Sequence, residues 1–225
     1  MLFRSAQGGG PPGGDILALV ADPTAPSTLY AATSAGGVYK TTNAGSDWAS
    51  VNTGLTPKAI LTLAIHASSP TTIYAGTATF PGGVYKTTNG GNSWTSVSSQ
   101  AITFLLIDPA NSSTMYAIAG GTGKVLKSTN SGVNWTDSSS GFPAGVGAKT
   151  LAIDPIDTSI IYVGLTADGV LKSVDSGANW TSSSIGLESD TTVSALAINP
   201  SSPAILFAST TEGLYRSINS GANWR

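Results

Sequence analysis

Apolar and polar residues alternate in short runs along the whole chain, and no stretch shows sustained helical periodicity. Apolar runs such as LALVADP (17–23) and LAIDP (151–155) are typical of strands buried on both faces. Each run is followed by a short turn, often with proline, and by a second strand centred on an aromatic residue, as in TIYAGT around Tyr74. A third segment of the form VYKTT alternates with period two. The pattern predicts an all-β chain of short strands.

These strands recur in five similar units of about 45 residues, each with four predicted strands, which is typical of a β-propeller blade. We therefore predict an all-β, five-bladed β-propeller of four-stranded antiparallel blades. It forms one domain over residues 1–225. The predicted blades cover residues 15–52, 59–98, 102–139, 148–184 and 192–225.

A fixed set of residues occupies the turn between the third and fourth predicted strands. An Asn or Asp comes first, and its side chain is expected to accept a hydrogen bond from a backbone N–H two residues on. A glycine two positions later supplies a positive φ, and a tryptophan that seals one blade against another begins the fourth strand. The five sets are Asn43, Gly45, Trp48; Asn89, Gly91, Trp94; Asn130, Gly132, Trp135; Asp175, Gly177, Trp180; and Asn219, Gly221, Trp224.

These residues resemble the Asp-box (BNR-type) repeat, Ser/Thr-x-Asp-x-Gly-x-x-Trp. The family includes sialidases, xyloglucan-degrading hydrolases, sortilin-type receptors and photosystem II assembly factors. The resemblance implies the propeller fold and a structural role for the turn, but it does not select a function, because the same blade serves enzymes and binders. Four of the five units carry Asn in the Asp position, and Asn can still cap the turn.

The fifth unit contains three predicted strands and, at Trp224-Arg225, the start of a fourth. We expect residues 2–6 to supply a closing strand that pairs with 213–218, with the Gly/Pro-rich segment 8–14 as a linker. The alternative is that LFRS (2–5), which resembles LYRS (214–217), is the third strand of a truncated sixth blade.

Composition narrows the range of functions. Charged residues make up 10% of the chain and the net charge is -2, which argues against nucleic-acid partners and a polybasic membrane anchor. With no cysteine, disulfides, zinc–thiolate sites and a thiol nucleophile are excluded. We expect no cofactor, no metal and no membrane insertion. Residues 1–14 lack the features of a signal peptide, and an extracellular or cell-surface location is expected with the signal absent from this chain.

In the usual blade topology, the Asp-box and Asp-Pro turns share one rim and the longer connections lie on the other, here called the variable-loop rim. Its loops are expected at 53–60, 77–83, 98–103, 119–124, 139–149, 166–169, 184–193 and 210–213. Unrepeated residues in or next to these loops are the ligand-binding candidates. The principal ones are Phe80, Phe142, Asp168, Glu188, Asp190 and Glu212, and the others are Asp15, Lys58, Lys124 and Lys149.

Other titratable residues are better explained by the repeat. Asp22, Asp108 and Asp154 recur at one turn position and are expected to cap it, and His66 replaces that Asp in the second unit. A sialidase needs three arginines around its substrate, and the chain contains Arg4, Arg216 and Arg225. However, Arg216 aligns with a lysine in every other unit, which marks a repeated strand position, and no Tyr/Glu nucleophile pair can be identified.

The sequence therefore favours a non-catalytic binding or scaffolding propeller that recognises a protein or a carbohydrate through its variable-loop rim. The alternative is a glycoside hydrolase, or a fragment of one, which needs two carboxylates about 5–10 Å apart. Few aromatic residues occupy the variable loops, which argues mildly against a sugar-processing cleft. A third hypothesis is a structural unit of a larger surface assembly.

Overall fold

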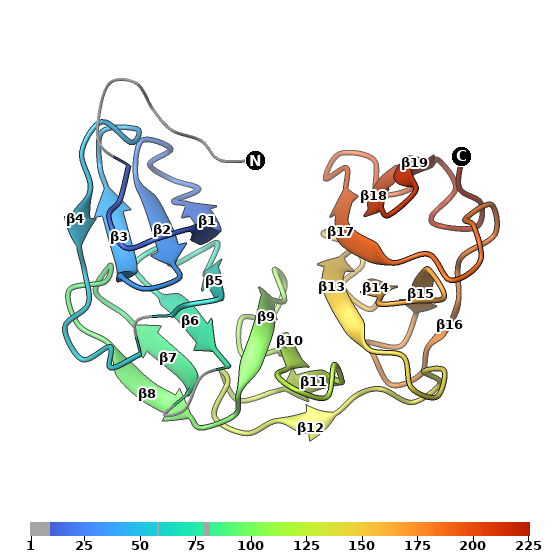
Figure 1. Cartoon of the computed structure of the whole chain (residues 1–225), viewed down its shortest axis with the longest axis horizontal. Helices are drawn as coiled ribbons and strands as arrows, with labels where there is room; N and C mark the ends of the chain where they lie inside the picture. Colours follow the sequence, from blue (N-terminus) through green and yellow to red (C-terminus); the bar gives the residue numbers. More distant parts are fainter. Residues whose placement is uncertain (1–9, 58, 79–81) are drawn as a thin grey trace. The chain divides into compact units, whose positions relative to one another are not determined.

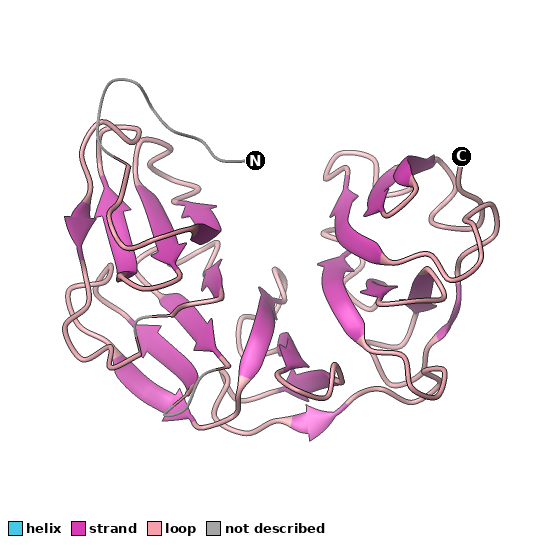
Figure 2. Ribbon diagram, in the orientation of Figure 1, coloured by secondary structure: helices cyan, strands magenta, loops and turns pink. Residues whose placement is uncertain are grey.

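The computed structural model describes residues 10–57, 59–78 and 82–225. All regular secondary structure in these residues is β-strand, so this part of the chain has no helix that could cross a membrane (Figures 1 and 2). The strands form five antiparallel sheets, of which four have four strands and the fifth has three. The predicted five-bladed β-propeller architecture of antiparallel blades is confirmed.

The chain divides into two compact units, Met1–Ile107 and Asp108–Arg225. The first unit contains blade one, with β1 (Ile16–Ala21), β2 (Leu29–Thr33), β3 (Gly37–Thr41) and β4 (Ala49–Ser50). It also contains blade two, with β5 (Thr62–Ile65), β6 (Ile73–Thr77), β7 (Gly83–Thr87) and β8 (Thr95–Ser98), and the first strand of blade three, β9 (Ile102–Ile107).

The second unit contains the remaining strands of blade three, β10 (Met115–Ala119), β11 (Val125–Ser128) and β12 (Thr136–Asp137). Blade four follows, with β13 (Ala148–Ile153), β14 (Ile161–Leu165), β15 (Val170–Ser173) and β16 (Thr181–Ser182). Blade five consists of β17 (Val193–Ile198), β18 (Leu206–Thr210) and β19 (Gly213–Ser217).

Within a blade, consecutive strands pair in an antiparallel meander, and the register repeats from blade to blade. Tyr74 pairs with Lys86 in blade two, and Tyr162 pairs with Lys172 in blade four. The fourth strand begins one residue after the tryptophan, not at it as the sequence suggested. The reason is that the tryptophan N–H does not join the ladder: in blade two the Trp94 N–H donates to the Thr53 carbonyl in the loop after blade one (2.8 Å).

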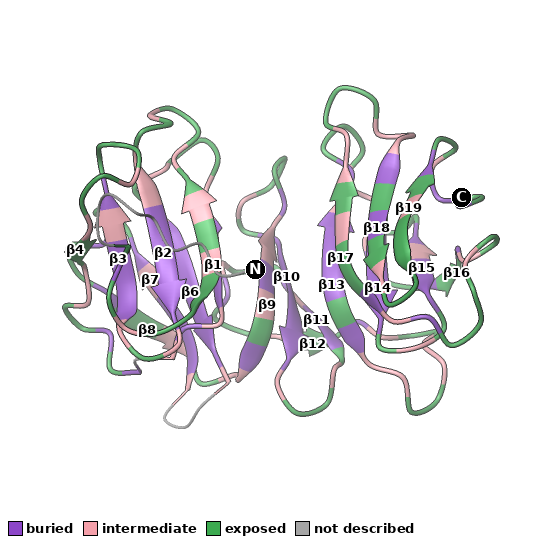
Figure 3. Cartoon of the chain, turned by 45° about the horizontal axis from the view of Figure 1, so that its top comes forward, coloured by how far each residue is buried: buried purple, intermediate pink, exposed green. Residues whose placement is uncertain are grey.

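Burial is greatest in the second strands, and β6, β10 and β14 are buried along their whole length (Figure 3). The expectation that each first strand is buried on both faces holds for β5 and most of β13. It is wrong for β1, which is largely exposed, and for β9 and β17, which are only partly buried. Blades one and five are the end blades of their own units, so β1 and β17 are each covered on one face by a blade of that unit.

The core of each unit lies between successive blades. In the first unit, Tyr30 and Val38 of blade one pack in a cluster with Leu63 and Trp94 of blade two. In the second unit, residues of blades four and five form an equivalent cluster around Trp224. The apolar side chains on one blade are therefore buried by contact with the next blade of the same unit.

The expected closing strand, residues 2–6, lies outside the described residues. Its proposed partner, β19, is already paired at one position, because Arg216 and Arg225 exchange two backbone hydrogen bonds (2.8 and 3.1 Å). Arg225 directly follows Trp224, and the residues at the same position in other blades pair in the same way: Ala49 pairs with Lys40 in blade one, and Thr181 pairs with Lys172 in blade four. Blade five thus begins its own fourth strand at Arg225.

Candidate functional site

The two ends of each blade carry different kinds of connection. The turn between the first two strands and the Asp-box turn contact each other at one end, here called the Asp-box rim. The Gly90 N–H donates to the Thr71 carbonyl and the Ser176 N–H to the Ser159 carbonyl (2.9 Å each). Because the strands are antiparallel, the other connections lie at the opposite end. The two-rim arrangement expected from the sequence is confirmed.

Each Asp-box turn is a compact hydrogen-bonded loop. In blade four the Ser173 hydroxyl donates to Asp175 Oδ1 (2.7 Å) and accepts from the Gly177 N–H (2.9 Å). Asp175 Oδ1 also accepts from the Asn179 N–H (2.9 Å), four residues on and not two as expected. The side chain and backbone of Asn179, followed by the Ser173 hydroxyl, lower the pKa of Asp175 to about 2. The other four turns make the same bonds with Asn.

Two consecutive residues of the turn are left-handed. Gly177 has a φ of 82°, as predicted for the glycine, and Ser176 before it has a φ of 57°. The second feature was not predicted, and it costs a non-glycine residue about 1–2 kcal/mol. It leads to a further contact, because the Ser176 carbonyl accepts hydrogen bonds from the Tyr116 hydroxyl (3.0 Å) and Lys127 Nζ (2.8 Å) of the preceding blade.

This Tyr–Lys pair recurs between blades four and five, where Tyr162 and Lys172 donate to the Ser220 carbonyl (2.9 and 3.0 Å). Each lysine Nζ also lies over the ring of its own tyrosine, 5.3 Å from the centroid in blade four. Burial, and secondarily the Asp154 charge, raises the pKa of Tyr162 to about 12, so its hydroxyl remains a donor at neutral pH. The repeated lysines therefore hold blades together.

The tryptophans divide into two groups. Trp94, Trp180 and Trp224 are buried, and each indole N–H donates to a carbonyl of the preceding blade (2.7 Å). Trp135 is half-buried and donates to Gly132 in its own turn (3.0 Å). Trp48 is also half-buried. Within each unit, Trp94, Trp180 and Trp224 thus lie between successive blades, as a sealing role requires.

The repeated aspartates cap turns, as predicted. Asp22 Oδ1 accepts the N–H groups of Thr24 and Ala25, and Asp108 Oδ1 accepts those of Ala110 and Asn111. The Thr24 hydroxyl and backbone N–H lower the pKa of Asp22. Asp154 makes the same bonds, and His66 stands in the equivalent turn with Ser68 beside its Nδ1 (3.4 Å). The three aspartates therefore stabilise turns, and their carboxylates already accept backbone hydrogen bonds.

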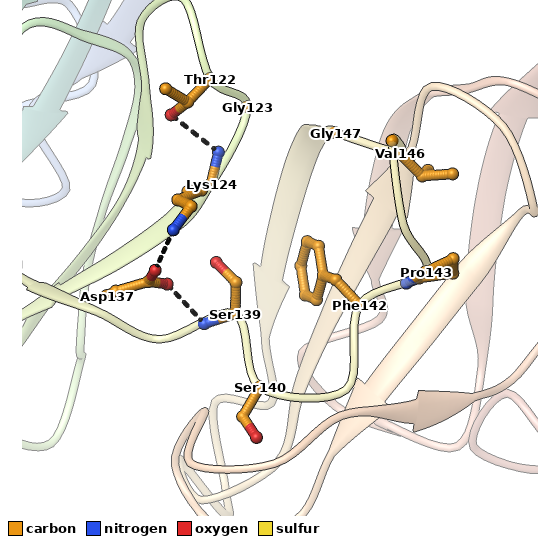
Figure 4. Close-up of a pocket in the computed structure, with 11 residues that line it drawn as sticks. Thr122, Gly123, Lys124, Asp137, Ser139, Ser140, Phe142, Pro143, Val146 and Gly147 are labelled. Atoms are coloured by element: carbon orange, nitrogen blue, oxygen red, sulfur yellow. Dashed lines mark hydrogen bonds and ion pairs between the residues drawn. The ribbon is translucent and has the colours of Figure 1, made fainter.

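A pocket of about 560 Å³ opens on the variable-loop rim of the second unit (Figure 4). Its size is within the range of about 300–1,000 Å³ typical of small-molecule sites. The β10–β11 loop and the connection from blade three to blade four form it. It is lined by Thr122, Gly123, Lys124, Asp137, Ser139, Ser140, Phe142, Pro143, Gly145, Val146 and Gly147.

The pocket has a charged wall and an apolar wall. Lys124 Nζ forms an ion pair with Asp137, whose other oxygen accepts the Ser139 N–H (3.0 Å). The hydrogen bond from Lys124 is the main cause of a lowered pKa for Asp137. Phe142 and Val146 lie across the pocket from this pair (Figure 4). The pocket thus combines hydrogen-bonding groups whose charges are balanced with an aromatic and aliphatic surface.

Phe142 also has a packing role that the sequence reasoning missed. It follows Gly141, where a Cβ atom would lie 2.4 Å from the Trp180 carbonyl oxygen, and its ring meets the Trp180 ring edge-on at 5.8 Å. A glycine followed by an apolar residue also occurs at Leu55 and Leu187, and these two leucines pack in the cores of their units. The repetition of this Gly-apolar pair in three connections could have predicted the packing role of Phe142 from the sequence.

The candidate acids lie on neighbouring loops of the second unit. Asp168 is in the β14–β15 turn, Glu188 and Asp190 are in the connection to β17, and Glu212 is in the β18–β19 turn. Asp168 and Asp190 both adopt a left-handed conformation (φ 65° and 58°). In the described part of the chain, no three acidic or histidine side chains converge closely enough to hold a metal ion.

Backbone hydrogen bonds join these loops. The Gly169 N–H donates to Thr191 and the Thr211 N–H to Thr192 (3.1 Å each). Ser184 Oγ donates to the Asp168 carbonyl (2.9 Å). The structure therefore brings the acidic loops of blades four and five together, although none of these acids lines the pocket beside Phe142.

The remaining candidates are dispersed. Asp15 exchanges hydrogen bonds with Ser34 through its backbone, and Lys149 lies exposed on β13. Lys58, Phe80 and Arg4 lie outside the described residues. Of the three arginines that the sequence analysis set aside, only Arg216 and Arg225 lie in the described part, and these are joined through their backbones.

No protein-family model matches the chain, and no curated protein matches it. The fold is similar to that of several solved structures. An ancestral GH74 enzyme has a TM-score of 0.78 and 24% identity over 95% of this chain and 31% of its own length. The GH74 xyloglucanase from Xanthomonas campestris has a TM-score of 0.65 and 17% identity over 99% of this chain and 46% of its own.

YCF48 from Cyanidioschyzon merolae has a TM-score of 0.62 and 15% identity, over 93% of this chain and 84% of its own length. This chain thus spans less than half of the two GH74 structures and most of the YCF48 structure. At these identities the similarity shows the fold and not the activity. The chain is a β-propeller of the kind seen in GH74 and YCF48 structures.

Proposed function

We propose that this chain is a non-catalytic binding or scaffolding propeller that recognises a protein or a glycan through its variable-loop rim. The pocket beside Phe142 supports the proposal most directly. The Lys124–Asp137 pair on its wall does not recur in the other blades and is half-exposed (55% and 48% of each side chain), so it is accessible to a ligand.

Of the two ligand classes, the pocket favours a neutral oligosaccharide. Paired charges leave no net attraction for an ion, but they still offer a donor and an acceptor to hydroxyl groups. The apolar wall of Phe142, Pro143 and Val146 suits the C–H face of a sugar ring. An extracellular or cell-surface location fits such a ligand.

Calorimetric titration with neutral oligosaccharides, such as cellohexaose and mannohexaose, tests the proposal. Lys124→Ala and Phe142→Leu should each weaken binding about tenfold or more, the cost of a central contact of 1.4 kcal/mol or above. Leucine preserves packing, because the repeat itself places Leu55 and Leu187 at this position. Lys149→Ala removes the same charge elsewhere and should bind normally. Binding that survives both pocket variants would contradict the proposal.

The second candidate function is glycoside hydrolysis, which the joined acidic loops of blades four and five favour. The pocket itself contains one carboxylate, Asp137, whose lowered pKa is the opposite of what a general acid needs. We expect no turnover of aryl β-glucosides or aryl sialosides. Turnover that disappears in Asp168→Asn or Glu188→Gln would establish the hydrolase instead.

A further inference from the structure

Residues 137–142, at the end of blade three, have one side towards the pocket and another towards blade four. Asp137, Ser139 and Phe142 line the pocket, and Ser139 and Phe142 can be seen beside it in Figure 4. Ser138, which lies between the first two, is buried and is not among the lining residues. The 137–142 segment therefore carries binding candidates on a backbone that also packs inside the protein.

Trp180, from the Asp-box of blade four, contacts the 137–142 segment at three places. Its indole N–H donates to the Ser138 carbonyl (2.7 Å), and its backbone N–H donates to the Ser140 carbonyl (3.0 Å). Its ring meets the Phe142 ring edge-on, with the centroids 5.8 Å apart. Because only 3% of Trp180 is exposed, little water competes for these hydrogen bonds, which strengthens them.

The Asp-box turn of blade four adds a further contact. Ser138 Oγ donates to the Gly177 carbonyl (2.6 Å), and the Gly177 N–H is itself bonded to Ser173 Oγ (2.9 Å). The segment can approach blade four this closely because Gly141 has a φ of 96° and no Cβ atom to meet the Trp180 carbonyl. Blade four thus binds the backbone of the segment immediately before and after Ser139.

We propose that Trp180 is a positioning residue for ligand binding, which holds Asp137 and Phe142 in the geometry that a bound ligand requires. The inference rests on the proposed function of the pocket. Trp180 does not line the pocket, so it acts through the 137–142 segment. Binding groups that are already fixed by supporting residues lose less conformational freedom when a ligand binds, and the affinity is correspondingly higher.

Blade five repeats these contacts at a segment that is separate from the pocket. The Trp224 indole N–H donates to the Ser183 carbonyl and its backbone N–H to the Ile185 carbonyl (2.7 and 2.8 Å). Leu187 takes the place of Phe142, and Trp224 is as well buried as Trp180. None of these residues of blade five or of its connection lines the pocket. Trp224 is therefore a matched control, which shares the structural role of Trp180 but not its place beside the pocket.

Amide hydrogen exchange of the ligand-free chain tests the positioning itself. Trp180→Phe removes the indole N–H, and the Ser138 and Phe142 N–H groups, which are hydrogen-bonded in the structure, should then exchange about tenfold faster, because local opening of the segment costs less free energy. Trp224→Phe should instead speed exchange of the Ser183 N–H and leave the other two unchanged.

Calorimetric titration with cellohexaose or mannohexaose tests the consequence for binding. Trp180→Phe should weaken binding about tenfold, a loss equivalent to one hydrogen bond. Trp224→Phe should bind as the parent does, although its Tm falls by a similar amount. Ser138→Ala removes only the hydrogen bond to Gly177, and with its counterpart Ser183→Ala it supplies a milder pair if a tryptophan variant fails to fold.

The two measurements separate a failure of this inference from a failure of the proposed function. Unchanged exchange at Ser138 and Phe142 in Trp180→Phe would overturn the positioning role, as would equal losses of affinity in the Trp180 and Trp224 variants. A parent chain that binds neither sugar would contradict the proposed ligand class. Hydrogen exchange then decides alone whether Trp180 holds the 137–142 segment in place.

Discussion

The two rims of the blades differ in how their side chains are used. On the Asp-box rim, the Ser or Thr hydroxyl and the Asn or Asp Oδ1 of all five turns each accept a backbone N–H group. On the variable-loop rim of the second unit, Lys124, Asp137 and Phe142 face a pocket of about 560 Å³. The repeated polar residues of the Asp-box rim therefore serve folding, whereas Lys124 and Asp137 occur once and are the residues to which we assign a binding role.

Loss of an interblade tryptophan should have the largest effect. Trp180→Ala is expected to lower the free energy of unfolding by about 3–5 kcal/mol, because the indole is buried and its N–H is bonded to Ser138. Trp48→Ala should cost less, because Trp48 is half-buried. Urea unfolding measures both, and equal losses would contradict the division of the tryptophans.

Removing the hydroxyl of the Tyr–Lys pair should have a smaller effect. Tyr162→Phe is expected to cost about 0.5–1.5 kcal/mol, the net value of one hydrogen bond. The Ser220 carbonyl still accepts from Lys172, which limits the loss. Tyr215→Phe is the control, since its hydroxyl is bonded to no residue in the described ranges, and its midpoint should not move. A Tyr162 variant as stable as the parent would show that the pair does not hold blades four and five together.

The Asp-box of blade four should make stability depend on acid. The pKa of Asp175 is lowered from 3.8 to about 2 in the folded chain, so its ionised form stabilises the fold. This contribution is complete above pH 4 and is lost as the pH falls towards 2. Asp175→Asn, which copies the other four turns, should lack it. The difference in Tm between parent and variant should therefore change between pH 6 and pH 2.5, and a constant difference would be the contrary result.

The pocket wall should contribute least to stability. Lys124→Ala is expected to change the free energy of unfolding by about 0.5 kcal/mol or less, because exposed ion pairs stabilise little. Thermal unfolding of Lys124→Ala, compared with that of Lys149→Ala and of the parent chain, measures this change. A loss as large as that of Trp180→Ala would place Lys124 among the structural residues and remove the contrast between the rims.

The blades could be predicted from the sequence because their signals repeat. The tryptophan, the glycine and the apolar first strand occur five times, so periodicity identified the strands and both rims. What could not be predicted are contacts between units of the repeat. The two donors to the Ser176 carbonyl, Tyr116 and Lys127, depend on how one blade meets the next.

The candidate site was predicted in part. Phe142 and Lys124 were selected as unrepeated loop residues, and the structure places both at the pocket. Asp137 was missed because it follows Trp135 in the strand and resembles a surface residue in the sequence. Only the pairing with Lys124, across 13 residues, makes it part of the wall. Side-chain partnerships of this kind carry no periodic signal.

The contrast between the rims is tested most directly by an NMR titration of the labelled chain with cellohexaose or mannohexaose. We expect the shifted backbone amides to lie in residues 119–124 and 137–147, and we expect Lys124→Ala to remove the shifts and Lys149→Ala to keep them. Shifts centred on the Asp-box turns, such as 43–48 or 175–180, would contradict binding at the variable-loop rim, as would shifts that persist unchanged in Lys124→Ala.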